Sequence, residues 1–551
     1  MTELIPNSPI AVQKSARTCK GRLLTSADAG KIIPLKYEWL HREDSVRSGQ
    51  IAINIEMMET AELLLNGVGV TVMAHFVPML AFERFGGSMD ELNKSYKKQN
   101  GAAGTVVPFF ESNKYAQNGV TYSNFSSYGS EADESGLTDQ FYKVMGIHIE
   151  GTNINTSPVE AYNSIVNHLR KARSKSLPLR NAFDHSLADA FWINNGMQNI
   201  VPDFDQNLLD GQVSLNGLTF QAPIKSPKYS RDGMTGTATD NTLTTDTLGY
   251  SPAMSGADII DSGDMYLFND IYAELTSGGN ATMSLSDIDQ AKRTASFAKL
   301  RQKYDGIDEE YIIDLLMSGI NVPEESMKQP ILLGKQTSMI GFNQRYATDG
   351  ANLDKSATNG QATINMNIRT PAMNTGGVIM ITAQIVPEQL WERKKDYFLY
   401  TTDPDTLPNF LPDFLDPEKV SVVKNDHVDV NHSTPDATFG YAPLNHEWQR
   451  DSVNIGGKYY RPANDAFDED RQKIWSAEAI NPTLNQDFYL CSEVHKKVFS
   501  DQVSDSFEIT ALTNFNIVGN TVFGTGLIEA DATSDYDTII AQTDATRIVK
   551  P

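Results

Sequence analysis

Apolar and polar residues alternate over residues 51–55 and again over residues 68–76, on either side of Asn66-Gly67. Strict alternation is typical of β-strands with one buried face. Asn-Gly favours a tight turn, because both residues tolerate positive φ. The pattern predicts an antiparallel hairpin over residues 51–77.

Other stretches predict strands in the same way. Residues 378–386 are nearly all apolar, as in a strand covered on both faces. Pro34 places the candidate strand 32–40 at a sheet edge or a strand beginning. The remaining candidate strands cover residues 364–368, 506–519 and 521–530. Strands towards both ends of the chain predict a sandwich whose terminal strands pair, and the two-sheet jelly roll is one such fold.

Helical patterns interrupt this β framework in the middle of the chain. Ser157, Pro158 and Glu160 predict a helix start with Ser157 as the N-cap. A second start at residue 286 leads towards Tyr304, and a third helix ends at Gly319. We therefore expect a mainly β protein with long helical and loop insertions.

Composition and charge limit the partners. The chain has 551 residues, 40% of them hydrophobic and 21% charged, with a net charge of −24 and a pI near 4.8. Such a chain repels nucleic acid as a whole, so contact with it must be local or pass through a basic partner. Cys19 and Cys491 are its two cysteines, which fits a reducing compartment. No secretion signal or membrane-spanning stretch is visible, so we expect assembly in a cytoplasm and no membrane insertion.

The N-terminal charge differs from that of the whole chain. Residues 1–22 have a net charge of +3, with Glu3 as their one acidic residue. The basic residues are Lys14, Arg17, Lys20 and Arg22. Because no helical or strand period is visible, residues 1–29 are interpreted as a basic arm. The arm is either a flexible, solvated terminus or a segment that contacts nucleic-acid phosphates.

The stretch ILLGKQTS (331–338) resembles the end of a phosphate-binding loop. That motif needs a glycine five residues before Gly334 and Ser or Thr directly after Lys335. Gln329 and Gln336 occupy those positions. Nucleotide hydrolysis at this site is therefore not expected.

The richest polar cluster is NDHVDVNHSTPD (425–436). On a strand, His427, Asp429 and Asn431 would share one face, and a His with a carboxylate can hold a metal ion. No third strong ligand accompanies them, so a solvated loop or strand edge is the alternative. No serine-hydrolase elbow, HExxH helix or cysteine pattern is present. We predict no catalytic residue and no cofactor.

Several segments in order resemble the major capsid protein of the Microviridae, small icosahedral phages with single-stranded DNA. Residues 300–345 resemble its helix–turn–helix step into a strand through Pro330, Leu333, Gly334 and Lys335. The other similar segments are residues 30–35, 74–85, 387–400, 439–462 and 481–489. Residues 42–47 depart from the family pattern, and residues 100–140 and 225–285 do not match it.

The resemblance implies an eight-stranded antiparallel jelly-roll domain over residues 30–551, with large insertions at approximately 80–360 and 388–505. It implies a T=1 shell of sixty copies around a circular single-stranded DNA genome, assembled in the host bacterial cytoplasm and found in the virion. The implied partners are other capsid subunits, a small basic DNA-packaging protein, pilot or minor virion proteins, and a host receptor bound by surface insertions. It implies no enzymatic activity.

Two other classes of protein are alternatives to a major capsid protein. A phage attachment or carbohydrate-binding β-sandwich protein would need exposed aromatic residues flanked by paired carboxylates in a groove. A minor structural spike usually needs a shorter chain.

Overall fold

The structure is a computed structural model of the chain. It describes residues 12–112, 115–117, 120–122, 140–147, 154–194, 197, 199–204, 224–225, 228–231, 234–237, 259–261, 264–268, 272–273, 293–294, 296–297, 301, 304, 307, 310–320, 322–346, 356–404, 407–416, 418–448, 454–460, 473–475, 481–492 and 494–524. These residues form two compact units, residues 1–204 with 321–551, and residues 205–320. The second unit lies within the first predicted insertion.

The first unit contains two main β-sheets. The five-stranded sheet has the order β1 (Ser15–Ala27), β21 (Phe507–Gly519), β3 (Asp44–Thr60), β17 (Ser356–Met373) and β16 (Gly341–Tyr346), all antiparallel. The six-stranded sheet has the order β15 (Ile331–Met339), β4 (Val68–Pro78), β18 (Gly377–Gln389), β2 (Lys31–Leu40) and β7 (Ala188–Asp189), and β8 (Ile193–Asn194) pairs with β18 in parallel.

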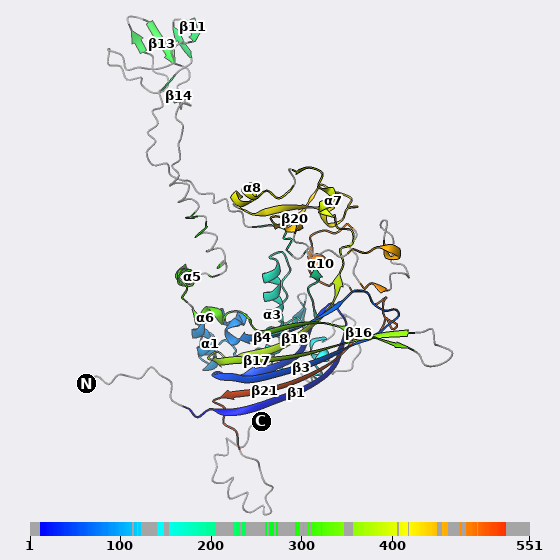
Figure 1. The fold of residues 1–551 in the computed structure, drawn as a ribbon. Coiled ribbons are helices and arrows are strands. Elements are labelled where there is room, and N and C mark those ends of the chain that lie inside the picture. The colour runs from blue at the N-terminus through cyan, green and yellow to red at the C-terminus, as the bar shows by residue number, and fades with distance from the viewer. Residues whose placement is uncertain are drawn as a thin grey trace, which may run out of the picture. The chain divides into compact units, whose positions relative to one another are not determined.

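One hydrophobic core joins the two sheets. It includes Ile53 of β3 and Ile364 of β17 from one sheet, and Val70 of β4 and Ile381 of β18 from the other. Figure 1 shows β1, β21, β3 and β17 side by side in one layer. The prediction of a mainly β, sandwich-like architecture is confirmed, whereas the count of eight strands is not, since the described sheets contain five and six.

The predicted hairpin over residues 51–77 is wrong. β3 and β4 lie in different sheets and face each other across the core. The Asn66 side chain instead forms buried hydrogen bonds with Trp475, accepting from its backbone N–H at 2.7 Å and donating to its carbonyl at 2.6 Å. The connection between the strands therefore crosses from one sheet to the other and is fixed by a distant residue.

The interpretation of residues 1–29 as an arm without regular structure is wrong for residues 15–27. These residues form β1, which pairs with β21 from Ser15↔Gly519 to Ala27↔Phe507. Side chains of β1 alternate between exposed and half-buried. The alternation is hidden in the sequence because the inward positions include Arg17 and Gly21. The predicted pairing of terminal strands is confirmed by this ladder.

The other strand patterns agree with the structure. β18 is buried along nearly its whole length, as its apolar sequence predicted, and β17 and β21 alternate as expected. Pro34 lies in β2 beside a register shift, and β2 has only the two-residue β7 on its outer side. Residues 521–524, the described part of the candidate strand 521–530, are not a strand.

The rejected phosphate-loop stretch forms the edge strand β15, which pairs with β4. A Cβ added at Gly334 would lie 2.8 Å from the Met366 sulfur, so close packing between the sheets favours glycine there. The Gly-Lys pair thus belongs to a packed strand.

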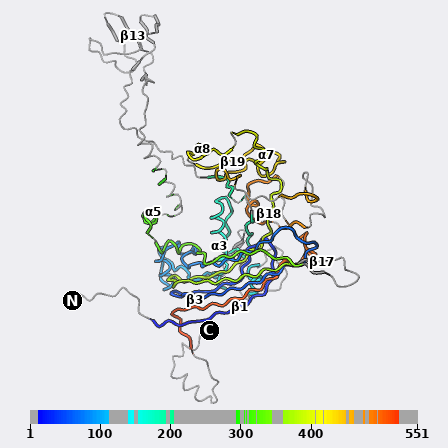
Figure 2. The backbone as a smooth tube through the Cα atoms, in the orientation of Figure 1, coloured from blue at the N-terminus to red at the C-terminus, as the bar shows by residue number. Residues whose placement is uncertain are grey.

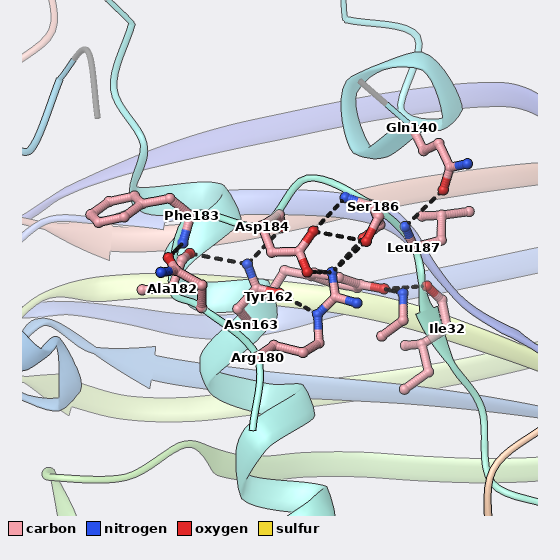
Figure 3. Close-up of polar contacts among 12 residues, drawn as sticks. Ile32, Gln140, Tyr162, Asn163, Arg180, Ala182, Phe183, Asp184, Ser186 and Leu187 are labelled. Atoms are coloured by element: carbon pink, nitrogen blue, oxygen red, sulfur yellow. Dashed lines mark hydrogen bonds and ion pairs between the residues drawn. The ribbon is translucent and has the colours of Figure 1, made fainter. Parts of the chain in front are cut away.

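Helices cover the outer face of the six-stranded sheet. α3 (Ser157–Arg173) packs Tyr162 and Ile165 into a second core with Met380 of β18. The Tyr162 hydroxyl donates to the Ile32 carbonyl at 2.7 Å and accepts from the Ala188 N–H at 2.9 Å (Figure 3). The central strands β4 and β18 are therefore buried on both faces, which explains the apolar sequence of β18.

The predicted N-cap of α3 is shifted by one residue. The N-cap is Thr156, and its hydroxyl donates to Glu160 at 2.7 Å. Glu160 also pairs with Arg84, so its carboxylate joins the helix to the segment after β4. Burial raises the pKa of Glu160, although Arg84 opposes that effect.

The remaining elements of the first unit are short. They are η1 (Met79–Ala81), η2 (Glu83–Phe85), α1 (Met89–Tyr96), β5 (Tyr115–Gln117), β6 (Val120–Tyr122), α2 (Gln140–Val144), α6 (Pro323–Ser326), α7 (Tyr397–Tyr400), α8 (Phe410–Leu415), β19 (Val420–Lys424), α9 (Asn425–Val428), β20 (Thr438–Pro443), η4 (His446–Trp448), η5 (Gly457–Tyr459) and α10 (Gln486–Tyr489). A third, smaller hydrophobic core includes Trp391, Phe439 and Phe488.

The second unit has a small antiparallel sheet in the order β11 (Met234–Thr237), β10 (Lys228–Arg231), β13 (Asp264–Phe268) and β12 (Ile259–Asp261), and a pair β14 (Tyr272–Ala273) with β9 (Ile224–Lys225). α5 (Glu310–Met317) is followed by Gly319 at φ +79°, as predicted. The predicted helix start at residue 286 lies outside the described residues. No helix among the described residues is long and apolar enough to cross a membrane.

Candidate nucleic-acid interface

The described side chains on the outer face of the five-stranded sheet are largely exposed along β1, β21, β3 and β17. Along β21, buried residues such as Phe515 alternate with exposed ones such as Asn514, and the central part of β17 has the same alternation. Figure 2 shows α3 and β18 together on one side of the layer that contains β3 and β1. Among the described residues, the insertions therefore pack on the side of the six-stranded sheet.

The strand register arranges the exposed side chains in rows across the sheet. One row contains Lys20, Asn514, Gln50 and Asn367, which are direct cross-strand neighbours on β1, β21, β3 and β17. Cross-strand neighbours have Cβ atoms about 4.5–5.5 Å apart, so a row presents adjacent polar groups.

The next row contains Arg22, Leu512, Ala52 and Asn365 in the same strand order. Together the two rows line a shallow depression of about 810 Å³. Small side chains such as Ala52 leave room above the sheet at its centre. Leu512 in the second row is also exposed, at 47%. We call the exposed polar residues of the two rows the amide face: Lys20, Arg22, Gln50, Asn365, Asn367 and Asn514.

Charge on this sheet face is mainly positive, in contrast to the chain as a whole. Arg47 and Arg369 are exposed on β3 and β17 beyond the Lys20 row. The carboxylates of Glu56 and Glu508 are direct neighbours towards the other end of the sheet. The amide face therefore carries two cations and no carboxylate.

The residue types on the amide face suit a polyanion with polar bases. Lysine and arginine pair with phosphates, and amide side chains can both donate and accept hydrogen bonds. Asn54, nearer the acidic end, already accepts hydrogen bonds from Gln361 at 2.8 Å and Thr363 at 3.0 Å. Phosphate contacts from these cations would position a nucleic acid without reading its sequence, and the amide groups could add hydrogen bonds to it.

The structure separates the four basic residues predicted to contact phosphates. Lys20 and Arg22 project from the outer face, and Lys14 is exposed just before β1. Arg17 has the opposite orientation and donates to Asp44 Oδ2 at 2.7 Å and to the Trp39 carbonyl at 3.1 Å. Arg17 is therefore held by an internal ion pair, and we do not include it in the proposed surface.

The metal candidates His427 and Asp429 do not share a strand face. Residues 425–428 form the short helix α9, and Asp429 follows it as a buried residue. The Asp429 carboxylate accepts from Arg393 and from the backbone N–H groups of Asn431 and Asn481. Within the described residues, no group of three metal-ligating side chains occurs.

His427 is also held by neighbouring side chains. Its ring packs edge-on against Tyr397 at 5.6 Å between centroids, and Asp426 lies 3.9 Å from Nε2. Burial lowers the pKa of His427, and the charge on Asp426 opposes this shift. Both candidates thus have structural partners in the described chain.

The amide side chains were missed by the sequence analysis. Asn365 and Asn367 were recognised only as the polar half of an alternation. Their alignment with Gln50 and Asn514 depends on which strands are neighbours and in which register. The regular recurrence of Asn and Gln at outward positions of 50–54, 361–367 and 514–516 is the signal that the sequence offers. No protein-family model and no curated protein sequence matches this chain.

Proposed function

We propose that this chain is a structural protein that assembles with copies of itself into a closed shell around single-stranded nucleic acid. The observation that carries the proposal is the amide face: an exposed sheet surface, positive and amide-rich, on a chain of net charge −24. Because the whole chain repels polyanions, this local surface would face the genome, and the acidic remainder would face away.

The asymmetry of the sandwich supports a shell with an inside and an outside. The central strands of the six-stranded sheet are buried, whereas the described strands of the five-stranded sheet expose their outer side chains. Long insertions provide area for contacts between copies. Obligate interfaces remove roughly 2,000–5,000 Å² of surface.

The resemblance to the Microviridae major capsid protein gives the proposal its finer form. The fold would be a jelly roll, sixty copies would form a T=1 shell, and the genome would be circular single-stranded DNA. A small basic packaging protein would neutralise DNA that the amide face does not reach. Pilot or minor virion proteins and a host receptor complete the proposed partners.

Electron microscopy of the purified, full-length protein tests this function. Closed shells of uniform diameter are expected, and co-expression with single-stranded DNA and the packaging protein should give filled shells. Monodisperse monomers or trimers under all assembly conditions would contradict the proposal.

A carbohydrate-binding protein is the second candidate, because one groove displays exposed aromatic rings. Tyr96 and Phe110 are exposed there, beside the half-buried Trp39. Among the described residues that line this groove, Glu43 is the one carboxylate, whereas cleavage of a glycoside needs a pair. Binding of oligosaccharides by a monomer or trimer, measured by calorimetry, would favour this alternative.

A further inference from the structure

Helix α8 exposes an unusual amount of apolar surface. Phe410, Leu411, Phe414 and Leu415 are each between 61% and 81% exposed. The Phe410 and Phe414 rings stack with centroids 5.7 Å apart. We call these four residues the α8 knob. Clustered exposed apolar side chains of this size are typical of a protein-interaction site.

Polar contacts anchor the knob to the unit behind it. The Asn409 side chain caps the helix by accepting from the Leu411 N–H at 3.4 Å. The Asn445 amide donates to Asp413 at 2.8 Å, and Lys419 lies over the Phe414 ring at 5.4 Å. The apolar side chains are thus presented on a fixed support, which lowers the entropy lost on binding.

An aromatic groove elsewhere in the same unit provides a suitable receptor. It has a volume of about 1170 Å³, and its lining includes Trp39, Tyr96, Phe109 and Phe110. Phe110 packs edge-on against Trp39 at 5.2 Å and against Phe109 at 4.9 Å. Because Phe109 also packs against Tyr96 at 5.5 Å, the rings form one continuous apolar wall.

The charges around the two surfaces are complementary. Residues 403–419 contain five acidic residues against the single cation Lys419. The groove is bordered by the cations Arg42 and Lys98 and by the carboxylate of Glu43, which leaves a net positive rim, and Arg42 lies 5.3 Å from the Tyr96 ring centre. Asp413 and Asp416 flank the knob, so docking would bring acidic and basic rims together.

We propose that the α8 knob of one copy inserts into the aromatic groove of a neighbouring copy. This inference rests on the proposed function, because it names the contact through which copies would join. Within one chain the four knob residues are exposed, so the knob does not occupy the groove of its own chain. A contact between two different patches is heterologous, and it closes into rings or shells when the rotation between copies is suitable.

The area of the knob fits the centre of such an interface. At about 150–250 Å² for each large side chain, its exposed part amounts to roughly 500 Å². A standard interface buries about 800 Å² on each partner. Every copy carries both a knob and a groove, so each copy would make this contact twice.

Disulfide trapping between two differently labelled preparations tests the pairing directly. Both full-length chains carry Cys19→Ser, one with Leu411→Cys on the knob and the other with Val106→Cys in the groove. After mixing and mild oxidation, a covalent dimer is expected on a non-reducing gel. Val503→Cys, at a 90% exposed loop position, replaces Leu411→Cys as the matched control and should give at least tenfold less dimer.

The possible results distinguish failure of the knob-in-groove contact from failure of the proposed shell. Shells without the mixed dimer, or a dimer formed by Leu411→Cys alone, would overturn the knob-in-groove pairing and leave the shell intact. A mixed dimer in a protein that never forms shells would support the pairing and overturn the shell. Phe410→Ser with Phe414→Ser should lower the sedimenting assembled fraction at least tenfold, whereas Val503→Ser should not change it.

Discussion

Arg17 and Asp44 form an ion pair of 2.7 Å that joins β1 to the beginning of β3, and Asp44 is fully buried. The backbone N–H of His41 donates to the same carboxylate oxygen at 2.8 Å. This contact distinguishes Arg17 from its basic neighbours on β1. The following predictions use that difference.

Replacement of Arg17 by Leu should destabilise the fold. Removal of one partner from a buried ion pair costs about 3–5 kcal/mol, because the remaining charge is buried without compensation. Chemical denaturation of the variant should show this loss in the free energy of unfolding. Lys20→Leu, at an exposed position of the same strand, should change it by less than about 0.5 kcal/mol. Equal effects of the two replacements would contradict the assigned role of Arg17.

Replacement of Lys20 and Arg22 by Gln should weaken binding of single-stranded DNA and reduce its salt dependence. Each phosphate contact contributes about 0.7 to the slope of log K against log salt, so the slope should fall by about 1.4. Fluorescence anisotropy with an oligothymidine at several salt concentrations measures it. Lys171→Gln with Lys175→Gln removes the same charge at exposed positions away from the amide face and serves as the control. An unchanged slope for the Lys20 and Arg22 variant would refute the interface.

Replacement of Asn66 by Ala should destabilise the first unit by about 2–4 kcal/mol. The change leaves the buried N–H and carbonyl of Trp475 without partners, and each unsatisfied group costs about 1–3 kcal/mol. Urea denaturation followed by tryptophan fluorescence would detect the loss. Asn365→Ala, on the exposed sheet face, should have little effect on stability. If Asn66 served only as a turn residue, Asn66→Gly would be tolerated.

Stability should decrease as the pH falls, in part because of His75. Burial, with a smaller contribution from His168, lowers the pKa of His75 to about 4. In the unfolded chain the His75 imidazole is protonated below about pH 6.5, whereas in the folded chain it is protonated only below about pH 4. The free energy of unfolding therefore falls as the pH is lowered between those values. The lost part is about 3 kcal/mol.

A comparison of wild type with His75→Phe isolates this contribution. The variant should lose less stability than wild type between pH 7 and pH 4.5 in denaturation experiments. His41→Gln, at an exposed histidine, should follow the wild-type curve. Parallel curves for wild type and His75→Phe would show that His75 does not carry the pH dependence.

Local alternation predicted β17 and β21 correctly, and a nearly continuous apolar run predicted β18, because burial of one or both strand faces selects apolar residues at those positions. It could not assign β3 and β4 to separate sheets. An amphipathic strand has the same pattern whichever strand lies beside it. In β1, two inward positions are not apolar: Arg17 forms an ion pair with Asp44, and Gly21 lies close to β21. The sequence of β1 therefore lacks the alternation of apolar residues that would have predicted a strand.

The candidate site was predicted only in part. Lys20 and Arg22 were identified by their charge alone. Arg17 could be excluded from the surface only because the structure shows its ion pair with Asp44. The amide face combines residues of four strands from distant parts of the chain, and only the register brings them into line. The α8 knob was likewise invisible, because FLPDFL is apolar in sequence whether it is buried or exposed.

The ladder between β1 and β21 also determines when the amide face can exist. β21 lies between β1 and β3, and β1 has no other neighbour in this sheet among the described strands, so β1 can join the sheet only after the ribosome has released residues 507–519. A nascent or prematurely terminated chain therefore lacks the surface proposed to contact DNA. Only chains that have been released beyond residue 519 would present the complete amide face.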